Sequence, residues 1–347
     1  MFKHFKYPII QAPMAGGVST VDLALTVSKN GGLGFLAAGY KTPEALEQEI
    51  VTCTAAALPF GVNIFVPQND VEDATLELYQ QRLEEDFHMK LPLQEPHDDF
   101  WIEKLAIVMK YKVPYVSFTF GCPSTVIIEQ LKSFGSQVIV TVTNLLEAKV
   151  AVSYGADAIC LQGVEAGGHR ATFDNVGEAP YISLMNLIHT IRKEVTIPII
   201  AAGGIMNGKD IHLALCAGAD AVQLGTAFLC TEESGANQVY KQALLSNEFS
   251  ETTLTRAFTG RLARGLKNDF ISTYEHIAPA IYPAVHTLTQ PIRATALNNE
   301  NPQAMSLWAS VHFKEIKQGS VKDVLEQLIT ELSVYQSPSK FGCNSYE

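Results

Sequence analysis

The chain alternates short, almost uninterrupted apolar runs with segments of helical periodicity. Apolar runs without polar alternation are typical of parallel strands that are covered on both faces. Many of the segments between them begin at Ser, Thr or Asn and end at Gly, as helices commonly do. Eight apolar runs precede residue 230, at residues 8–13, 32–39, 60–66, 115–121, 137–142, 158–163, 197–204 and 221–229.

Eight strand and helix units in succession predict an α/β protein with a TIM (β/α)8 barrel. That architecture needs about 250 residues, which matches the length of the repeating region. A doubly wound open sheet is the alternative fold. We assign the barrel to residues 1–230.

Two regions depart from the repeat. Residues 67–112 are too long for one crossover helix, and residues 70–100 carry ten acidic side chains against two basic ones. They predict an acidic helical insertion at about 67–100 with a solvated face, followed by the regular third helix. After Cys230 the strand pattern stops, and residues 231–347 predict a mostly helical C-terminal cap or subdomain, with one helix at 320–336.

Charge and composition narrow the class of ligand. The chain has 347 residues, 47% of them hydrophobic, and a formal net charge of -11, with no run rich in Lys or Arg. A nucleic-acid partner is therefore not expected, and a small-molecule substrate is. No apolar stretch has the length of a signal peptide or a membrane span, so we expect a cytoplasmic protein with no membrane partner.

The cysteines do not indicate a metal site. They show no CxxC pair and no metal-ligand spacing, so we expect reduced thiols, most of them in the core. The six positions are 53, 122, 160, 216, 230 and 343.

Glycines follow the last two predicted strands. Gly203 and Gly204 end the seventh run, and Gly225 lies in the eighth. In a TIM barrel the loops after strands seven and eight commonly bind a phosphate, since glycine lets backbone N–H groups come close to the anion. The alternative is that these glycines only make tight turns.

Polar side chains lie at other strand ends. Met14 begins the MAGG segment after the first run, Asn63 lies inside the third run and Gln162 ends the sixth. A buried amide must be hydrogen-bonded, and it can pair with a heterocycle that carries both donors and acceptors, such as a flavin. An internal hydrogen bond is the alternative for either amide alone.

His169 follows the sixth run behind two glycines, in the segment QGVEAGGHRATF (162–173). With an ordinary pKa of about 6.5, its ring can accept a proton at neutral pH. A histidine in a surface loop is the alternative. Glu165 and Arg170 flank it, and Arg170 could attract an anionic substrate or only solvate the loop.

Together these segments resemble class I nitronate monooxygenases, formerly called 2-nitropropane dioxygenases. The resemblance covers the barrel, reaches the tail and keeps the family's order of motifs. It implies a TIM barrel that binds FMN and uses O2 to oxidise alkyl nitronates to a carbonyl compound and nitrite, without NAD(P)H. Propionate 3-nitronate is the family's characteristic substrate. The motifs that carry it are QAPMAGGVST, GGLGFLAAGY, FGVNIFVP, SFTFGCPS, QGVEAGGHRATF, IPIIAAGGI, VQLGTAFL and GRLARGLKNDFI.

The resemblance also implies roles for single residues. His169 matches the family's catalytic base. Three positions depart from the usual pattern, Thr119, Ala171 and Asp269, and they concern substrate preference more than cofactor binding. The positions that match FMN contacts are Met14, Asn63, Gln162, Gly167, Gly203, Gly204, Gln223, Leu224, Gly225 and Thr226.

Three functions stay open at this point. The first is the FMN-dependent nitronate oxidase. The second is a related NADH-dependent FMN reductase, either an enoyl-acyl-carrier-protein reductase or an NADH:quinone reductase. The third is a protein that binds FMN without catalysis, against which the intact His169 argues. A homodimer is compatible with the sequence but not indicated by it.

Overall fold

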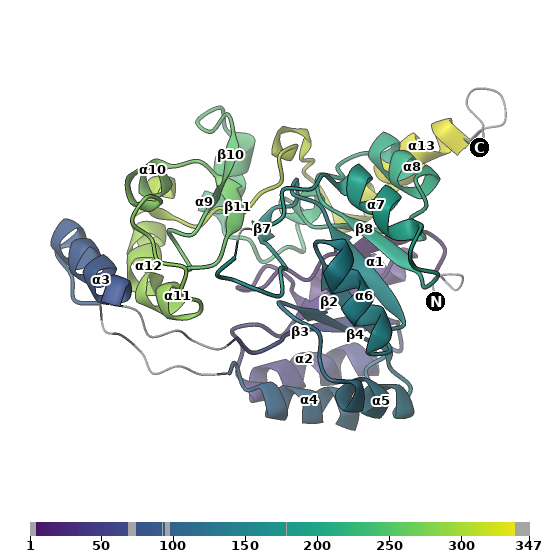
Figure 1. Cartoon of the computed structure of the whole chain (residues 1–347). Coiled ribbons are helices and arrows are strands. Elements are labelled where there is room, and N and C mark those ends of the chain that lie inside the picture. The colour runs from purple at the N-terminus through teal and green to yellow at the C-terminus, as the bar shows by residue number, and fades with distance from the viewer. Residues whose placement is uncertain (1–4, 69–73, 92, 94–97, 178, 337–347) are drawn as a thin grey trace.

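Eight parallel strands form one continuous sheet at the centre of the computed structural model (Figure 1), which describes residues 5–68, 74–91, 93, 98–177 and 179–336. Neighbouring strands follow the order β1-β9-β8-β6-β5-β4-β3-β2. Their bounds are β1 (Ile9–Gln11), β2 (Gly34–Ala37), β3 (Phe60–Phe65), β4 (Tyr115–Thr119), β5 (Gln137–Val142), β6 (Ala158–Gln162), β8 (Ile199–Ala202) and β9 (Ala221–Leu224).

The sheet closes between its two end strands. Ile10 and Leu33 form a parallel bridge, and the backbone N–H of Gln11 donates to the carbonyl of Leu33 at 2.9 Å. The Gln11 side chain adds a second link, because its Oε1 accepts the N–H of Phe35 at 2.9 Å. The predicted TIM barrel is thus confirmed, and the open-sheet alternative is wrong.

Helices surround the barrel, and several begin at the predicted caps. The side chains of Thr20, Thr42, Asn144, Ser183 and Asn207 each accept a backbone N–H of the first turn that follows them. Such a cap is worth about 1 kcal/mol. The helices are α1 (Val21–Lys29), α2 (Pro43–Ala55), α4 (Trp101–Lys110), α5 (Thr125–Ser133), α6 (Leu145–Ser153), α7 (Leu184–Arg192) and α8 (Gly208–Cys216).

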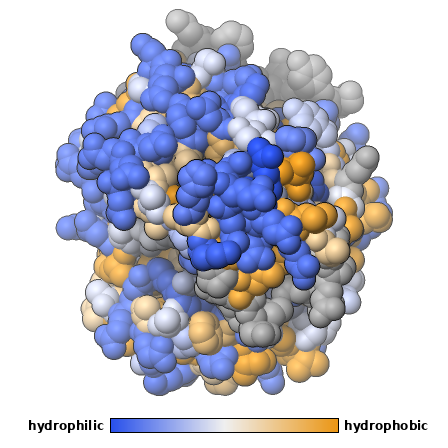
Figure 2. Space-filling model, turned by 90° about the vertical axis from the view of Figure 1, so that its left-hand side faces the viewer, coloured by the Kyte–Doolittle hydropathy of each residue, from blue (hydrophilic) through white to orange (hydrophobic). Residues whose placement is uncertain are grey.

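The acidic insertion contains the helix α3 (Ala74–Phe87), which lies apart from the barrel helices (Figure 1). Tyr79 and Leu83, one turn apart, are buried, and the Tyr79 hydroxyl donates to the carbonyl of Ala257 at 2.7 Å. The other positions of α3 are at least partly exposed, on a face that is largely hydrophilic (Figure 2). The helix and its solvated face are confirmed; residues 69–73, 92 and 94–97 of the predicted insertion lie outside the described residues.

The chain after β9 contains helices and also two strands that the sequence did not predict. A second sheet has the order β10-β11-β7, in which β7 (Gly168–His169) belongs to the loop after β6. The elements are the 3-10 helix η2 (Thr226–Phe228), α9 (Gln238–Leu245), β10 (Thr252–Thr255), β11 (Ala263–Leu266), α10 (Asp269–Tyr274), α11 (Ala284–Leu288), α12 (Gln290–Asn298), η3 (Pro302–Ala304), η4 (Phe313–Glu315) and α13 (Val321–Gln336).

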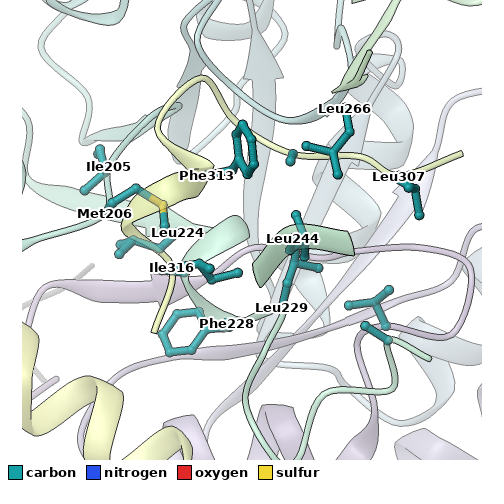
Figure 3. Close-up of a cluster of buried hydrophobic side chains, with 14 of the residues drawn as sticks. Ile205, Met206, Leu224, Phe228, Leu229, Leu244, Leu266, Leu307, Phe313 and Ile316 are labelled. Carbon is teal, nitrogen blue, oxygen red and sulfur yellow. The ribbon is translucent and has the colours of Figure 1, made fainter. Parts of the chain in front are cut away.

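The helix α13 packs against α8 and α1, where the eighth helix of a barrel belongs. The backbone N–H of Gly208, at the start of α8, donates to the Glu331 carboxylate at 2.9 Å. A buried cluster joins Leu224 and Phe228 at the end of the barrel to Leu266, Leu307 and Phe313 from the later chain (Figure 3). The division of the chain at residue 230 stays a prediction.

Four cysteines, Cys53, Cys122, Cys160 and Cys230, are free thiols, and all but Cys122 are buried. Cys216 is disulfide-bonded, contrary to the expectation of reduced thiols, and Cys343 lies outside the described residues. Within the described ranges, no helix is both long enough and apolar enough to cross a membrane, and no cluster of His, Cys, Asp and Glu is arranged to hold a metal ion.

Candidate active site

A cavity of about 480 Å³ lies at the carboxyl ends of the barrel strands, and residues of the later chain, from Gly235 to Ser310, line it as well. Leu224 is not among the lining residues; its side chain is buried in the cluster of Figure 3, and its carbonyl accepts the N–H of Ala12 at 2.8 Å. The structure brings the other predicted site residues together here: Met14, Asn63, Gln162, Gly167, His169, Gly203, Gly204, Gln223, Gly225 and Thr226.

Gly203 and Gly204 form an open backbone cradle after β8. Both have positive φ angles, 126° and 71°, which side chains other than glycine rarely tolerate. A Cβ on Gly204 would lie 2.9 Å from the Cβ of Glu165, so the loop has no room for one. His312 binds the carbonyl of Gly204 through Nδ1 at 2.8 Å. This cradle fits an anionic group such as the phosphate of a flavin.

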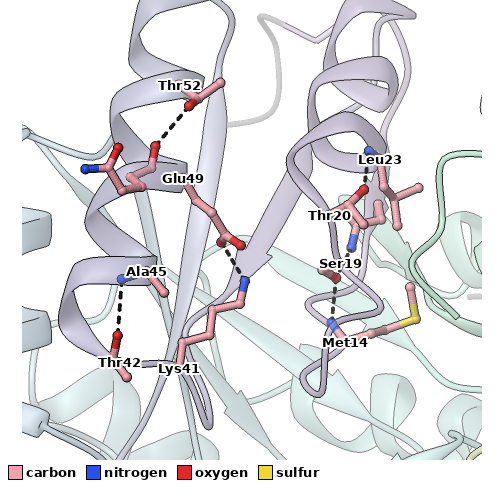
Figure 4. Close-up of polar contacts among 11 residues, drawn as sticks. Met14, Ser19, Thr20, Leu23, Lys41, Thr42, Ala45, Glu49 and Thr52 are labelled. Atoms are coloured by element: carbon pink, nitrogen blue, oxygen red, sulfur yellow. Dashed lines mark hydrogen bonds and ion pairs between the residues drawn. The ribbon is translucent and has the colours of Figure 1, made fainter.

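The cavity wall is also held by hydroxyl groups. The backbone N–H of Met14 donates to the Ser19 hydroxyl at 2.8 Å, which fixes the loop after β1 (Figure 4). Asn63 donates through Nδ2 to the hydroxyls of Ser117 at 2.9 Å and Thr119 at 3.0 Å. The Asn63 amide is therefore positioned by two neighbours before any ligand binds.

Gln162 has a structural task that the sequence left open. Its Nε2 donates to the carbonyl of His169 at 2.9 Å, and its Oε1 accepts the N–H of Ala171 at 2.9 Å.

Arg170 donates to the Oε1 of Gln162 at 3.0 Å and to the carbonyl of Gly163 at 2.6 Å. Arg170 is 1% exposed, so both alternatives offered for it, attraction of an anionic substrate and solvation of the loop, are wrong. Glu165 accepts the N–H of Leu184 at 3.0 Å, at the start of α7.

His169 is fixed on three sides. The backbone of His169, in β7, pairs with Ala263 of β11. The Nε2 atom of its ring lies 3.0 Å from the Thr259 hydroxyl. Its ring packs against Trp308, with 5.4 Å between ring centroids, and against Phe120 at 5.9 Å. Burial, together with the guanidinium groups of Arg261 and Arg293, lowers its pKa to about 3. The ring is thus neutral at neutral pH, and the expected ordinary pKa was wrong because the sequence could not show the desolvation of this partly buried side chain.

The Thr259 contact assigns the tautomer of His169. The Thr259 hydroxyl donates its one proton to the carbonyl of Arg261 at 3.0 Å, so toward His169 it acts as an acceptor. The Nε2 nitrogen therefore carries the ring proton. Nδ1 keeps its lone pair and is the nitrogen able to accept a proton from a substrate.

The lowered pKa predicts a pH effect on stability. An unfolded histidine has a pKa of about 6.5, so below that pH the unfolded chain binds a proton that the native His169 does not. Stability therefore falls as the pH drops from about 6.5 toward the native pKa, by up to about 1.4 kcal/mol per pH unit from this group. We expect His169→Gln to lose stability less steeply than the wild type in urea unfolding between about pH 7 and pH 5. Parallel curves would contradict the neutral ring.

Several cavity residues were missed by the sequence. Tyr40 stacks on His286 with 4.1 Å between ring centroids and an interplanar angle of 7°, and its hydroxyl lies 2.9 Å from that of Tyr282. A second cavity of about 190 Å³ shares Tyr40, His286 and Gln290 with the first. Tyr40 ends the motif GGLGFLAAGY, and in the later chain only the motif GRLARGLKNDFI, which contains β11, gave a signal. The helices that supply His286 and Gln290 have no comparable signal.

Comparison of this chain with known protein families, sequences and structures indicates one family. The sequence model described as nitronate monooxygenase matches residues 1–331. The chain belongs to the nitronate monooxygenase family. It is a flavin-dependent oxidoreductase with small-molecule substrates, in a family whose chemistry is the oxidation of nitronates and nitroalkanes.

Relatives of the nitronate monooxygenase family match the chain along its length. Proteins named probable nitronate monooxygenase from Staphylococcus haemolyticus and Bacillus subtilis are each 39% identical, and the matches cover 95% and 93% of this chain and 95% of either relative. A nitroalkane oxidase from Streptomyces ansochromogenes has a TM-score of 0.93 and 43% identity over 96% of this chain and 98% of its own. FabK from Thermotoga maritima has a TM-score of 0.75 and 27% identity, over 96% of this chain and 94% of its own.

The three departures from the nitronate monooxygenase pattern differ in their distance from the cavity. Thr119 lines it and binds Asn63. Ala171 is fully buried, and its N–H is held by Gln162. Asp269 lies in the first turn of α10, where a negative charge stabilises a helix. Thr119 is therefore the departure with direct access to a substrate.

Proposed function

We propose that this enzyme binds FMN and uses O2 to oxidise alkyl nitronates, of the propionate 3-nitronate class, to carbonyl compounds and nitrite. No NAD(P)H takes part. Neutral nitroalkanes are also substrates once His169 has removed a proton. The observation that carries the proposal is the position of His169, which lines the same cavity as the glycine cradle and is held at Nε2 by Thr259.

The cradle supports FMN over FAD. Gly203 and Gly204 after β8, with Gly225 and Thr226 after β9, offer one phosphate position in the loops where TIM barrels commonly bind phosphate. The sequence has no second glycine-rich fingerprint for an adenylate half. We predict that the purified protein is yellow and releases FMN on denaturation, as identified by chromatography. Release of FAD, or no flavin after reconstitution, would contradict this assignment.

When bound, the flavin supplies the electron chemistry that links the nitronate to O2. The chain's own residues bind, orient and deprotonate. Nδ1 of His169 takes the proton from the carbon that bears the nitro group, while Thr259 holds the ring by Nε2. Phe120 and Trp308 pack around the same ring and limit the access of water. A preformed nitronate needs no proton transfer, so it needs His169 less.

Thr259 acts through His169, which gives a prediction of its own. In Thr259→Val the ring loses its acceptor at Nε2, so both tautomers become accessible. We expect kcat/KM for a neutral nitroalkane to fall roughly 10- to 100-fold, as for other residues that orient a catalytic histidine, with little change for the preformed nitronate. Thr259→Ser should restore most of the loss because it keeps the hydroxyl. Equal losses on both substrates would show that Thr259 only supports the fold.

An NADH-dependent FMN reductase is the second candidate, because FabK from Thermotoga maritima shares the fold at 27% identity. Two relatives at 39% identity and the nitroalkane oxidase at 43% support the nitronate reaction instead.

Mixing the enzyme without oxygen, once with a nitronate and once with NADH, distinguishes the two candidate functions. We expect a nitronate to bleach the flavin absorbance and NADH to leave it unchanged; bleaching by NADH alone would favour the reductase. A protein without catalysis would respond to neither.

We also propose a cytoplasmic location. The free thiols of Cys53, Cys160 and Cys230 favour it, whereas the disulfide at Cys216 does not. Fractionation of the cells that produce the protein tests it, and recovery outside the cytoplasm would contradict it.

A further inference from the structure

The permanently charged side chain that lines the main cavity is positive. Among the described residues that line it, Arg293 is the only one with a permanently charged side chain, and none is Asp, Glu or Lys. This is unusual for a chain with a formal net charge of -11. An anion entering the cavity therefore meets a cation and no carboxylate.

Arg293 reaches the cavity from α12. Gln290, Arg293, Ala294 and Leu297 all line the cavity, and their spacing places them on one face of that helix. The later chain thus covers the opening of the barrel with a helix face that carries a single guanidinium group.

The hydrogen bonds of Arg293 leave part of its guanidinium group available. Its Nε donates to the Thr289 hydroxyl at 3.2 Å, and one terminal nitrogen donates to the carbonyl of His286 at 2.7 Å. Both partners are neutral, and none of the ion pairs among the described residues includes Arg293. Burial lowers its pKa to about 10, so it stays charged at neutral pH.

Another arginine of the later chain, Arg261, has no such donors available. It is fully buried, donates to the carbonyls of Arg170 and Thr172, and lies 3.9 Å above the ring of Phe120. It does not line the cavity. The donors of Arg261 bind other parts of the chain, whereas Arg293 keeps the donors of its other terminal nitrogen for a ligand.

The flavin phosphate does not account for Arg293. The glycine cradle lies in the loops after β8 and β9, and Ser310 joins it through the Thr226 hydroxyl at 3.1 Å. Arg293 instead binds His286, which stacks on Tyr40 beyond the end of β2. In the barrel order, β2 is two strands away from β9 and three from β8.

We propose that Arg293 binds a carboxylate at the far end of the substrate and so selects nitronates with an anionic tail. This inference rests on the proposed function and assigns it a specificity residue. A guanidinium group pairs with a carboxylate through two parallel hydrogen bonds, which fixes direction as well as charge. The tail at Arg293 would then direct the nitronate end toward His169.

Two nitronates of similar length test the assignment. Propionate 3-nitronate carries the carboxylate, and propane-1-nitronate lacks it. For Arg293→Gln we expect KM for propionate 3-nitronate to rise roughly 10- to 100-fold, the usual worth of a charged hydrogen bond, while KM for propane-1-nitronate changes little. Arg293→Lys should keep part of the preference. Arg82→Gln, the same change at an exposed residue on α3, is the matched control and should behave as the wild type.

Binding without turnover separates this inference from the proposed function. Succinate resembles propionate 3-nitronate with a carboxylate in place of the nitro group. Calorimetry should show that succinate binds the wild type and Arg82→Gln equally and Arg293→Gln at least about 10-fold more weakly, with flavin content unchanged. If no nitronate is oxidised but this difference holds, the proposed function fails and the anion site stands. Equal succinate binding, equal losses on both nitronates, or loss of flavin from Arg293→Gln would overturn the assignment.

Discussion

Gly203→Asp is expected to purify without flavin and to stay colourless after reconstitution. Gly203 has a φ of 126°, and the Cβ that Asp adds would lie 3.1 Å from the backbone nitrogen of Ala166. The added carboxylate would stand where the cradle must accept a phosphate, and two negative charges about 4 Å apart repel strongly in a partly buried site. Visible absorbance per protein, before and after incubation with FMN, measures the loss.

A second glycine supplies the control. Gly135, in the turn before β5, also has a positive φ, 97°, and a Cβ there meets no atom within 4 Å. Gly135→Asp therefore shares the backbone strain and the added charge but lies at the amino end of a strand, away from the cavity. It should keep its flavin. A Gly203→Asp protein that retains as much flavin as Gly135→Asp would place the phosphate elsewhere.

His169→Asn is expected to lose activity on neutral nitroalkanes by roughly 100-fold or more, the usual contribution of a general base. Oxidation of preformed nitronates should fall much less, since they need no deprotonation. Flavin content should be preserved, because Gln162 holds the segment through the backbone carbonyl of residue 169, which Asn retains. Initial rates with a nitroalkane and with its separately prepared nitronate give the comparison.

The competing view is that His169 only shapes the loop. It predicts that both substrates suffer equally and that flavin binding weakens. Such a result would refute the base assignment. His189→Asn, the same change at an exposed position of α7, is the matched control and should leave both rates unchanged.

The barrel was predictable because its strands are apolar on both faces. The eight observed strands all lie within the predicted runs, and the caps Thr20, Thr42 and Asn207 begin the helices as expected. The second sheet was not predictable, since β7 is two residues long and pairs with β11 from about 95 positions later in the chain. Alternation within so short a strand gives no signal.

The residues that line the cavity were predictable where they come from the barrel strands, and less so where they come from the later chain. Gly203, Asn63 and Gln162 line it because parallel strands end on the same side of a barrel. Two side chains were misread where burial decides their behaviour. Arg170 is buried and binds Gln162 and Gly163 through one terminal nitrogen, and the pKa of His169 depends on neighbours far away in the sequence. Arg293 was missed because it lies on a tail helix whose position only the folded chain reveals.

Oxygen consumption with nitrite analysis tests the central claim most directly. We predict that the purified enzyme, mixed with propionate 3-nitronate in air, consumes O2 and forms nitrite, and that adding NADH does not change the rate. With NADH alone, oxygen consumption should stay at the background level. Oxygen consumption or quinone reduction that requires NADH, with no nitrite from the nitronate, would contradict the account.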